Sequence, residues 1–305
     1  MIFLSQTVIG LLGNFFLLYH YSVLYFTRGT LRYTDLMVKH LTVANILIFL
    51  SRGILQTISA FGLNYFLSNI GCQLIFYVHR VGRGMSLGST CLLSIFQAFT
   101  ISPRNSRCTE LKVHTSQYVG LSHSLILCWV VNMLVNSVVP MYVTGEWNGN
   151  NHTPGNDFLY CSWVDNNRVP QLLVIILLSS YDILCLGLMI WACSSTVFIL
   201  YRHRQRVQHI HRTNLSSRSS PESRVTESIL VLLSTLYHFT RSPTYLHLYI
   251  VHFYYPSKWL VNIAALITAS FPTICPFVLI SRDPRIPKPS SACCGENTQL
   301  SKLVK

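Results

Sequence analysis

The sequence predicts an all-α membrane protein, a seven-transmembrane helix bundle with its N-terminus outside and its C-terminus in the cytosol. Two observations carry this prediction: long apolar segments alternate with polar loops, and positive charge gathers on one side of them. Residues 1–27, 113–145 and 259–281 contain no Asp, Glu, Lys or Arg. A helix needs roughly 20 mostly apolar residues to cross the hydrocarbon core, and in lipid it must satisfy its backbone polar groups internally. Such runs are typical of membrane-spanning helices.

The seven predicted spans are apolar segments of similar length at residues 7–26, 38–58, 72–102, 119–143, 172–201, 227–251 and 259–280. The sixth span is the least regular, because Arg241 and Pro243 interrupt it. In a chain of 305 residues, seven helices and short loops leave no room for a separate soluble domain. We therefore expect one domain over residues 1–305, with a basic third cytoplasmic loop at 202–224 and a cytosolic tail at 281–305.

The distribution of Lys and Arg sets the orientation. Seventeen of the 23 basic residues fall in the loops and tail on one face, whereas the opposite loops hold only Arg168 and Lys258. Cytoplasmic loops carry the excess of Lys and Arg in membrane proteins. The net charge of +13 is therefore mainly a topology signal, explained by basic loops beside anionic lipid rather than by a nucleic-acid partner.

Two cysteines and one sequon fall on the predicted outer face. Cys72 begins the third span, and Cys161 lies in the long loop that follows the fourth. Because the outer compartment is oxidising, we expect these two to form a disulfide; the alternative is two free thiols. The sequon Asn151-His152-Thr153 lies in the same loop and predicts N-glycosylation of Asn151.

Several longer motifs resemble one receptor family. They are residues 40–45 (HLTVAN), 76–84 (FYVHRVGRG), 88–97 (GSTCLLSIFQ), 100–107 (TISPRNSR), 198–215 (FILYRHRQRVQHIHRTNL) and 279–283 (LISRD). Over nearly its whole length the chain resembles the vomeronasal type 1 receptors, which are G-protein-coupled pheromone receptors. The resemblance implies a multi-pass receptor of the plasma membrane. It also implies a small-molecule pheromone ligand and coupling to a heterotrimeric G protein of the inhibitory class.

Comparison with the wider rhodopsin-like class shows which signatures are present. Gly13-Asn14 and Trp129 match its first-helix pair and its fourth-helix tryptophan. Asn45 replaces the second-helix aspartate, and Gln97 stands where the arginine of the Asp-Arg-Tyr motif would fall. Because a neutral amide replaces the carboxylate, we expect no sodium ion in the core.

The chain also departs from its closer relatives. Tyr181 stands where related receptors usually carry a proline before Asp182. Residues 237–247 (YHFTRSPTYLH) are more basic than the usual sixth helix. Because that helix moves on activation, a signalling-impaired receptor of the same family is an alternative function.

Charged residues inside the spans are the candidate functional residues, because such charges are costly in lipid and face the bundle interior. His79 and Arg83 are four residues apart on the third span, and Arg80 lies between them. Our hypothesis is that His79, Arg80 and Arg83 line a ligand cavity and meet an anionic or carbonyl group, since guanidinium suits carboxylate and sulfate. The alternative is that the arginines pair with Asp182 or with carbonyl groups. Asp182 is the one acid within a span core, and we expect it in an interhelical salt bridge.

The predicted cytosolic face offers a second set of candidates. Arg104, Arg202, Arg204 and Arg206 are expected to contact the G protein, the alternative being a solvated linker beside anionic lipid. Cys293 and Cys294 follow the last span and are candidates for palmitoylation, or are idle thiols. His203, His209 and His211 lack zinc-site spacing with any cysteine, so we expect neither a metal nor a cofactor.

Two other function classes fit poorly. A transporter would show internal repeats and interrupted helices at matching positions of two halves, which seven spans do not provide. An enzyme would need a motif such as His-Glu-x-x-His or Gly-x-Ser-x-Gly in its structural context. The first does not occur; the letters of the second occur at residues 84–88, but inside the predicted third span and not at the strand-to-helix turn that a nucleophilic serine needs. We therefore predict a receptor that is not an enzyme, with a membrane transporter as the remote alternative.

Overall fold

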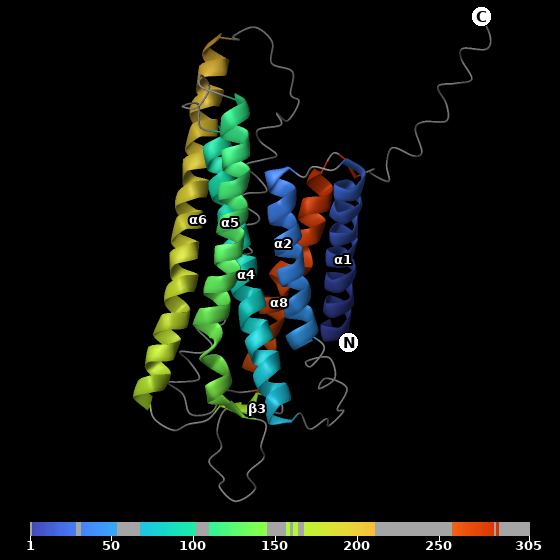
Figure 1. Cartoon of the computed structure of the whole chain (residues 1–305), viewed down its shortest axis with the longest axis vertical. Helices are drawn as coiled ribbons and strands as arrows, with labels where there is room; N and C mark the ends of the chain where they lie inside the picture. Colours follow the sequence, from blue (N-terminus) through green and yellow to red (C-terminus); the bar gives the residue numbers. More distant parts are fainter. Residues whose placement is uncertain are drawn as a thin grey trace, which may run out of the picture.

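The computed structural model describes residues 2–28, 32–53, 68–101, 110–144, 157–158, 161–163, 168–210, 258–283 and 285–286. Six long helices fill most of these ranges: α1 (Ile2–Arg28), α2 (Tyr33–Ile48), α4 (Asn69–Ile101), α5 (Glu110–Asn136), α6 (Arg168–Ile210) and α8 (Lys258–Arg282). They run side by side along the long axis (Figure 1). The predicted sixth span, 227–251, lies outside the described residues.

Helix α4 is the centre of the bundle. It packs against α2 on one side and against α5 and α6 on the other, while α1 packs against α8 and α2. Every residue from 81 to 91 is buried, including Met85 and Leu87, whose exposed fraction is zero. Because α4 is surrounded by other helices over this stretch, it can carry polar side chains without exposing them to lipid.

Hydropathy alone marks four of the described helical segments as long and apolar enough to cross a membrane. They are Ile2–Thr27, Tyr33–Ser51, Ser122–Tyr142 and Ser179–Arg202, and α8 holds a shorter apolar segment, Leu266–Ser281. Exposed large apolar side chains on these helices, such as Leu12, Leu134 and Trp191, have the lipid-facing positions expected of membrane helices.

Several helix ends differ from the predicted spans. Helix α2 begins at Tyr33 and passes into a π-helical turn, Phe49–Gly53. Helix α5 ends at Asn136 and gives way to a 3-10 turn, Val139–Tyr142, that contains Pro140. Proline lacks an N–H and fixes φ, which disfavours a regular α-helix here, and α5 does not reach residue 143 as the hydropathy suggested.

The predicted third cytoplasmic loop begins as helix rather than loop. Helix α6 has 43 residues and runs to Ile210, eight residues past Arg202. At 1.5 Å per residue it is about 65 Å long, roughly twice the hydrocarbon thickness. Residues 202–210 contain no Gly or Pro to end the helix, so it extends beyond the membrane.

A small antiparallel sheet was not expected from the apolar pattern. Its strands are β1 (Val143–Thr144), β2 (Asp157–Phe158) and β3 (Cys161–Trp163), in the order β1-β3-β2. Val143 pairs with Trp163, and Phe158 pairs with Cys161. The sheet lies at the end of the bundle where α4 begins, opposite the C-terminal ends of α1, α6 and α8 (Figure 1).

Candidate ligand pocket

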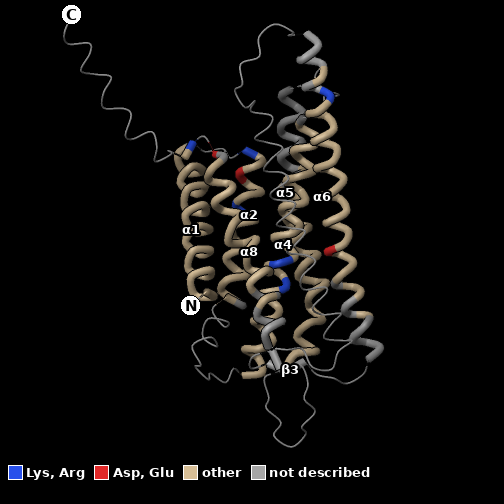
Figure 2. The backbone as a smooth tube through the Cα atoms, turned by 180° about the vertical axis from the view of Figure 1, so that it is seen from behind, with Lys and Arg blue, Asp and Glu red and all other residues tan. Residues whose placement is uncertain are grey.

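Three charged side chains of α4 and α6 lie close together inside the bundle. Figure 2 shows blue segments of α4 and a red segment of α6 at a similar level of the bundle. The two basic residues of α4 are Arg80 and Arg83, and the one acidic residue of α6 is Asp182. All three line a pocket between α4, α5 and α6. Since such charges are costly in lipid, this level is the first place to look for function.

Arg83 and Asp182 form an ion pair between α4 and α6. Arg83 Nη2 lies 2.8 Å from Asp182 Oδ2, and the two side chains are 6% and 15% exposed. At this distance the contact is also a charge-assisted hydrogen bond. Removing one partner of a buried pair typically costs about 3–5 kcal/mol, because it leaves the other charge uncompensated. The pair therefore ties α4 to α6.

Arg80 has a weaker partner. Its Nε donates to Asn136 Oδ1 of α5 over 3.4 Å, which is long for a hydrogen bond. Among the residues that the structure describes, Arg80 forms no ion pair. With Asp182 already paired to Arg83, the three charges of this level sum to one net positive charge beside the pocket.

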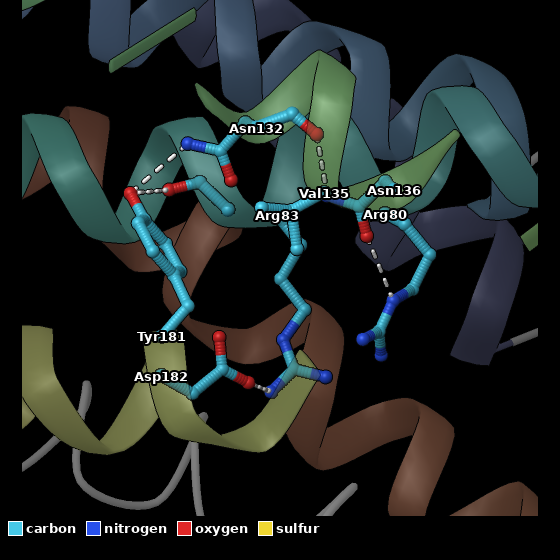
Figure 3. Close-up of a pocket in the computed structure, with 8 residues that line it drawn as sticks. Arg80, Arg83, Asn132, Val135, Asn136, Tyr181 and Asp182 are labelled. Carbon is cyan, nitrogen blue, oxygen red and sulfur yellow. Dashed lines mark hydrogen bonds and ion pairs between the residues drawn. The ribbon is translucent and has the colours of Figure 1, made fainter. Parts of the chain in front are cut away.

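A chain of hydrogen bonds connects the amides of α5 with α6. Asn132 Nδ2 donates to the Tyr181 hydroxyl at 3.0 Å and to the Cys128 carbonyl at 2.8 Å. Asn136 Nδ2 donates to the Asn132 carbonyl at 2.8 Å. Because Asn136 also accepts from Arg80, the Arg80 side chain is linked to Tyr181 through two asparagines one helical turn apart (Figure 3).

Gly84 makes room for this arrangement. A Cβ added at Gly84 would overlap the Asn132 side-chain oxygen and would lie 2.8 Å from Asn132 Cγ. A residue with a side chain at position 84 would therefore push Asn132 away from α4. Small residues at helix contacts commonly permit such close approach in membrane bundles.

The pocket is polar and narrow. Including its open part, it measures about 280 Å³, and its enclosed part has room for roughly one water molecule. The lining residues are Arg80, Arg83, Gly84, Asn132, Val135, Asn136, Tyr181 and Asp182 (Figure 3). Such a space can hold a small polar group of a ligand, with an arginine and amide groups as its hydrogen-bonding partners.

Comparison with known proteins supplies the family. The profile described as the vomeronasal organ pheromone receptor family matches residues 1–292. This chain belongs to that family. It is 61% identical to the human protein named vomeronasal type-1 receptor 3 over 305 residues, covering 100% of this chain and 97% of the relative. It is 54% identical to human vomeronasal type-1 receptor 4, covering 93% of each chain, and 39% identical to human vomeronasal type-1 receptor 1, covering 99% and 85%.

In this vomeronasal receptor the three candidate ligand-binding residues differ in their position relative to the pocket. Arg80 and Arg83 line the pocket, whereas His79 is buried with 7% exposure and is not among the lining residues. Asn132, Asn136 and the Tyr181 hydroxyl were not predicted from the sequence to belong to this site. Two asparagines four residues apart in an otherwise apolar span were an available signal, because such residues share one helix face.

The described parts of the receptor include both cysteines expected at the outer end. Cys72 is disulfide-bonded and fully buried, and it packs with Val139 and Val143 beside the sheet. Cys161 begins β3, which pairs with β1. Its pairing with Cys72 stays a prediction. Of the other candidates, Arg202, Arg204 and Arg206 lie near the end of α6, while Arg104, Asn151, Cys293 and Cys294 fall outside the described residues.

A second polar network joins the other helices. Asn45 Nδ2 donates to Asn14 Oδ1 at 3.2 Å, and Asn45 Oδ1 accepts from the Ser86 hydroxyl at 2.8 Å. Asn14 in turn donates to the Pro272 carbonyl at 2.9 Å. The network is neutral and links α1, α2, α4 and α8. Among the residues described, no group of three or more His, Cys, Asp or Glu side chains could hold a metal ion.

Proposed function

We propose that this chain is a seven-helix G-protein-coupled receptor of the plasma membrane, with its N-terminus outside and its C-terminus in the cytosol. It binds small-molecule pheromones in the outer part of the bundle and activates an inhibitory-type G protein. Membership of the vomeronasal receptor family and the basic bias of one set of loops support this proposal. Six of the seven spans in this proposal are the described helices, and the seventh is the predicted sixth span at residues 227–251.

On this orientation the pocket lies in the outer half of the bundle. Arg80 is eight residues beyond Cys72 along α4, so it lies about 12 Å below that end of the helix. The disulfide at Cys72 and the small sheet lie above it. A ligand that enters past the sheet would therefore meet Arg80 before it reaches the Arg83–Asp182 pair.

The observation that carries the ligand assignment is the unequal pairing of the two arginines. Arg83 is balanced by Asp182, and Arg80 has a single long bond to an amide. A carboxylate or sulfate about 4 Å from Arg80 would gain roughly 4 kcal/mol at an effective dielectric constant of 20, before its desolvation cost. The proposed ligand is thus a small molecule with one negative charge. In this proposal Arg80 binds the negative charge, Arg83 forms part of the pocket wall, and the buried His79 packs behind it.

Receptor activation is a population shift, so the ligand must bind one bundle state more tightly than another. On the cytosolic side, Arg104, Arg202, Arg204 and Arg206 form the G-protein contact. The further parts of this proposal are a Cys72–Cys161 disulfide, glycosylation at Asn151 and palmitoylation at Cys293 and Cys294. Each would be read by its own mass shift in the purified receptor.

The test measures cAMP inhibition in cells that express a tagged receptor, with surface level measured on the same cells. The probes are sulfated and carboxylated steroids beside their neutral alcohols. Loss of the charge in Arg80→Gln is expected to weaken the response to acidic steroids by about tenfold or more, because one charge pair is lost. The matched variant Lys39→Gln removes a basic residue that lies outside the pocket lining and should leave potency unchanged.

Two outcomes would contradict this function. An equal response of Arg80→Gln and wild type to acidic steroids would remove Arg80 from the ligand site. Silence of the wild type to every probe at normal surface level, together with silence when residues 237–247 are replaced by those of an active relative, would contradict signalling through this pocket. Recovery after that replacement would instead favour the signalling-impaired alternative.

A further inference from the structure

The Tyr181 hydroxyl lies where three helices meet. It belongs to α6, accepts a hydrogen bond from Asn132 of α5 and donates one to the Gly84 carbonyl of α4 at 3.3 Å. The Cys128 sulfur of α5 lies 3.4 Å away. A phenol can donate one hydrogen bond and accept others, so a single hydroxyl serves all three neighbours. Figure 3 shows the ring reaching from α6 toward the Asn132 amide.

Gly88 leaves the space that this phenol fills. A Cβ at Gly88 would overlap the Cys128 sulfur and would lie 2.7 Å from the Tyr181 oxygen. Gly84 and Gly88 are one turn apart on α4, and each gives way to a polar side chain from a neighbouring helix. The phenol therefore occupies the layer of the bundle just beyond the pocket.

The lining of the pocket ends at this layer. Tyr181 and Asn132 line it, whereas Cys128 does not. Yet the Cys128 sulfur lies only 3.4 Å from the Tyr181 hydroxyl and 3.6 Å from the Asn132 amide. These two side chains stand between the pocket and the thiol. Tyr181 is the larger of the two side chains. It reaches Cys128 from α6, whereas Asn132 lies on α5 together with Cys128.

We propose that Tyr181 is a specificity-determining residue that closes the inner wall of the pocket and so limits the length of ligand that the pocket admits. The proposal rests on the proposed function, because it takes this pocket as the ligand site. The ring blocks the path toward Cys128, and the hydroxyl holds Asn132 in place. A smaller side chain at position 181 would extend the pocket inward to Cys128, whereas Tyr181→Phe would keep the barrier.

The test reads the barrier without any known ligand. Intact cells expressing surface-tagged receptor are treated with 2-sulfonatoethyl methanethiosulfonate, a small anionic thiol reagent that does not cross membranes. Modification of Cys128 is measured by mass spectrometry of the purified receptor. The variants are Tyr181→Ala, Tyr181→Phe and the double variant Tyr181→Ala with Cys128→Ala. Val135→Cys places a thiol in the pocket lining itself and reports whether the reagent reaches the pocket.

We expect Cys128 to react about tenfold faster in Tyr181→Ala than in wild type, because thiol reactivity follows exposure. Tyr181→Phe should stay near wild type, and the double variant should show no added modification at this site. Tyr181→Val, which keeps part of the apolar contact, replaces Tyr181→Ala if the alanine variant does not reach the surface. In Tyr181→Val we expect the rate of Cys128 modification to rise as well, but by less than in Tyr181→Ala.

Three results would overturn the proposal. Equal rates of Cys128 modification in wild type and in Tyr181→Ala would mean that the Tyr181 ring does not block access to Cys128. Slow modification of Cys128 in Tyr181→Ala, with fast modification of Val135→Cys, would place the barrier elsewhere while leaving the ligand pocket intact. Slow modification of Val135→Cys at normal surface level would remove the outward-facing pocket, and with it both this proposal and the proposed ligand site.

Discussion

Arg285 and Asp35 join two ends of the sequence through a two-point hydrogen bond. Arg285 Nη1 lies 2.9 Å from Asp35 Oδ2, and Arg285 Nη2 lies 2.7 Å from Asp35 Oδ1. The same guanidinium also bonds to Asp283 at 2.8 Å. The Tyr21 hydroxyl donates to Asp283 at 3.2 Å, so α1, α2 and the end of α8 meet at this arginine. The planar fork of arginine matches a carboxylate in a way that lysine cannot.

Loss of this pairing is expected to destabilise the receptor. Asp35 is almost fully buried, and Arg285 is 18% exposed, so solvent screening is limited. Asp35→Asn should lower the free energy of unfolding by about 3 kcal/mol, because Arg285 loses its two-point charge-assisted hydrogen bond to Asp35 and keeps only Asp283. The readout is the thermal melting temperature of the detergent-purified receptor. Arg285→Lys keeps the charge but loses the fork, and it should fall between wild type and Asp35→Asn. A melting temperature equal to wild type in Asp35→Asn would contradict the account.

The same cluster predicts how stability depends on pH. Burial raises the pKa of Asp283, but hydrogen bonds from Arg285 and Tyr21 outweigh it and hold that pKa below its ordinary value. Bonds to Asp35 and Asp283 keep the pKa of Arg285 far above its ordinary range. A carboxyl with a depressed pKa stabilises the fold above its unfolded pKa of about 4, and this contribution is lost as pH falls through the folded value. The melting temperature should therefore be steady from pH 8 to about 5 and fall below about pH 4.

Asp283→Asn is the control for that profile. It removes the titrating group, so the decline below about pH 4 should be shallower than in wild type. An identical decline in both proteins would assign the acid sensitivity to other carboxyl groups.

Hydropathy located the apolar helices, because an apolar segment of about 20 residues is most stable as a helix inside the membrane. Helix α8 spans Lys258–Arg282 against a predicted 259–280, and α1 spans Ile2–Arg28 against 7–26. Helix ends were harder to predict, because the signal measures apolar character and not the hydrogen bonds of the backbone. The chain at Pro140 is apolar but not α-helical, and α6 near Arg206 is α-helical but not apolar.

The candidate site was predicted in part. The arginines of α4 and Asp182 are conspicuous in an apolar context, so their functional interest could be read from the sequence. Which arginine meets Asp182 depends on how α4 and α6 are rotated about their axes, and one sequence does not carry that information. The hydroxyl of Tyr181 and the amide of Asn132 meet across α5 and α6 for the same reason.

The Arg83–Asp182 pair predicts a non-additive response. Asp182→Asn should reduce surface expression several-fold, because it leaves Arg83 buried without its counter-charge. Arg83→Gln should act in the same direction but less strongly, because Asp182 loses its hydrogen-bonded partner while Arg80 remains at the same level. The double variant Arg83→Gln with Asp182→Asn removes both charges and should recover part of the loss, with a coupling of about 1–3 kcal/mol in melting experiments. The measurement is flow cytometry of the tagged receptor, followed by melting of the purified protein. Additive losses in the double variant would show that the two side chains act separately.

Gly84 and Gly187 make a matched pair for steric tests. A methyl group at Gly84 would overlap Asn132, whereas nothing lies within 4 Å of the corresponding position at Gly187. Gly84→Ala should destabilise the receptor by about 1–3 kcal/mol through overpacking. Gly187→Ala should be neutral or should stabilise α6 by up to about 1 kcal/mol, since glycine is a poor helix former. Asn132→Ala in the Gly84→Ala background removes the obstacle and should restore part of the lost stability. Equal effects of the two glycine variants would mean that α4 and α5 are not in close contact at this level.

The neutral amide of Asn45 predicts insensitivity to sodium. Asn45 is 1% exposed, and both ends of its amide are used, one by Asn14 and one by Ser86. A cation placed here would find carbonyl and hydroxyl oxygens but no carboxylate. The wild-type melting temperature should therefore be the same in sodium chloride and in choline chloride at equal ionic strength. Asn45→Asp should be less stable in choline, because it buries an unpaired charge, and sodium should recover part of that loss by binding the folded state. Asn45→Ala is the matched control that lacks the charge and should not respond to sodium. A sodium-dependent rise in the wild type would show that the amide network binds the ion without a carboxylate.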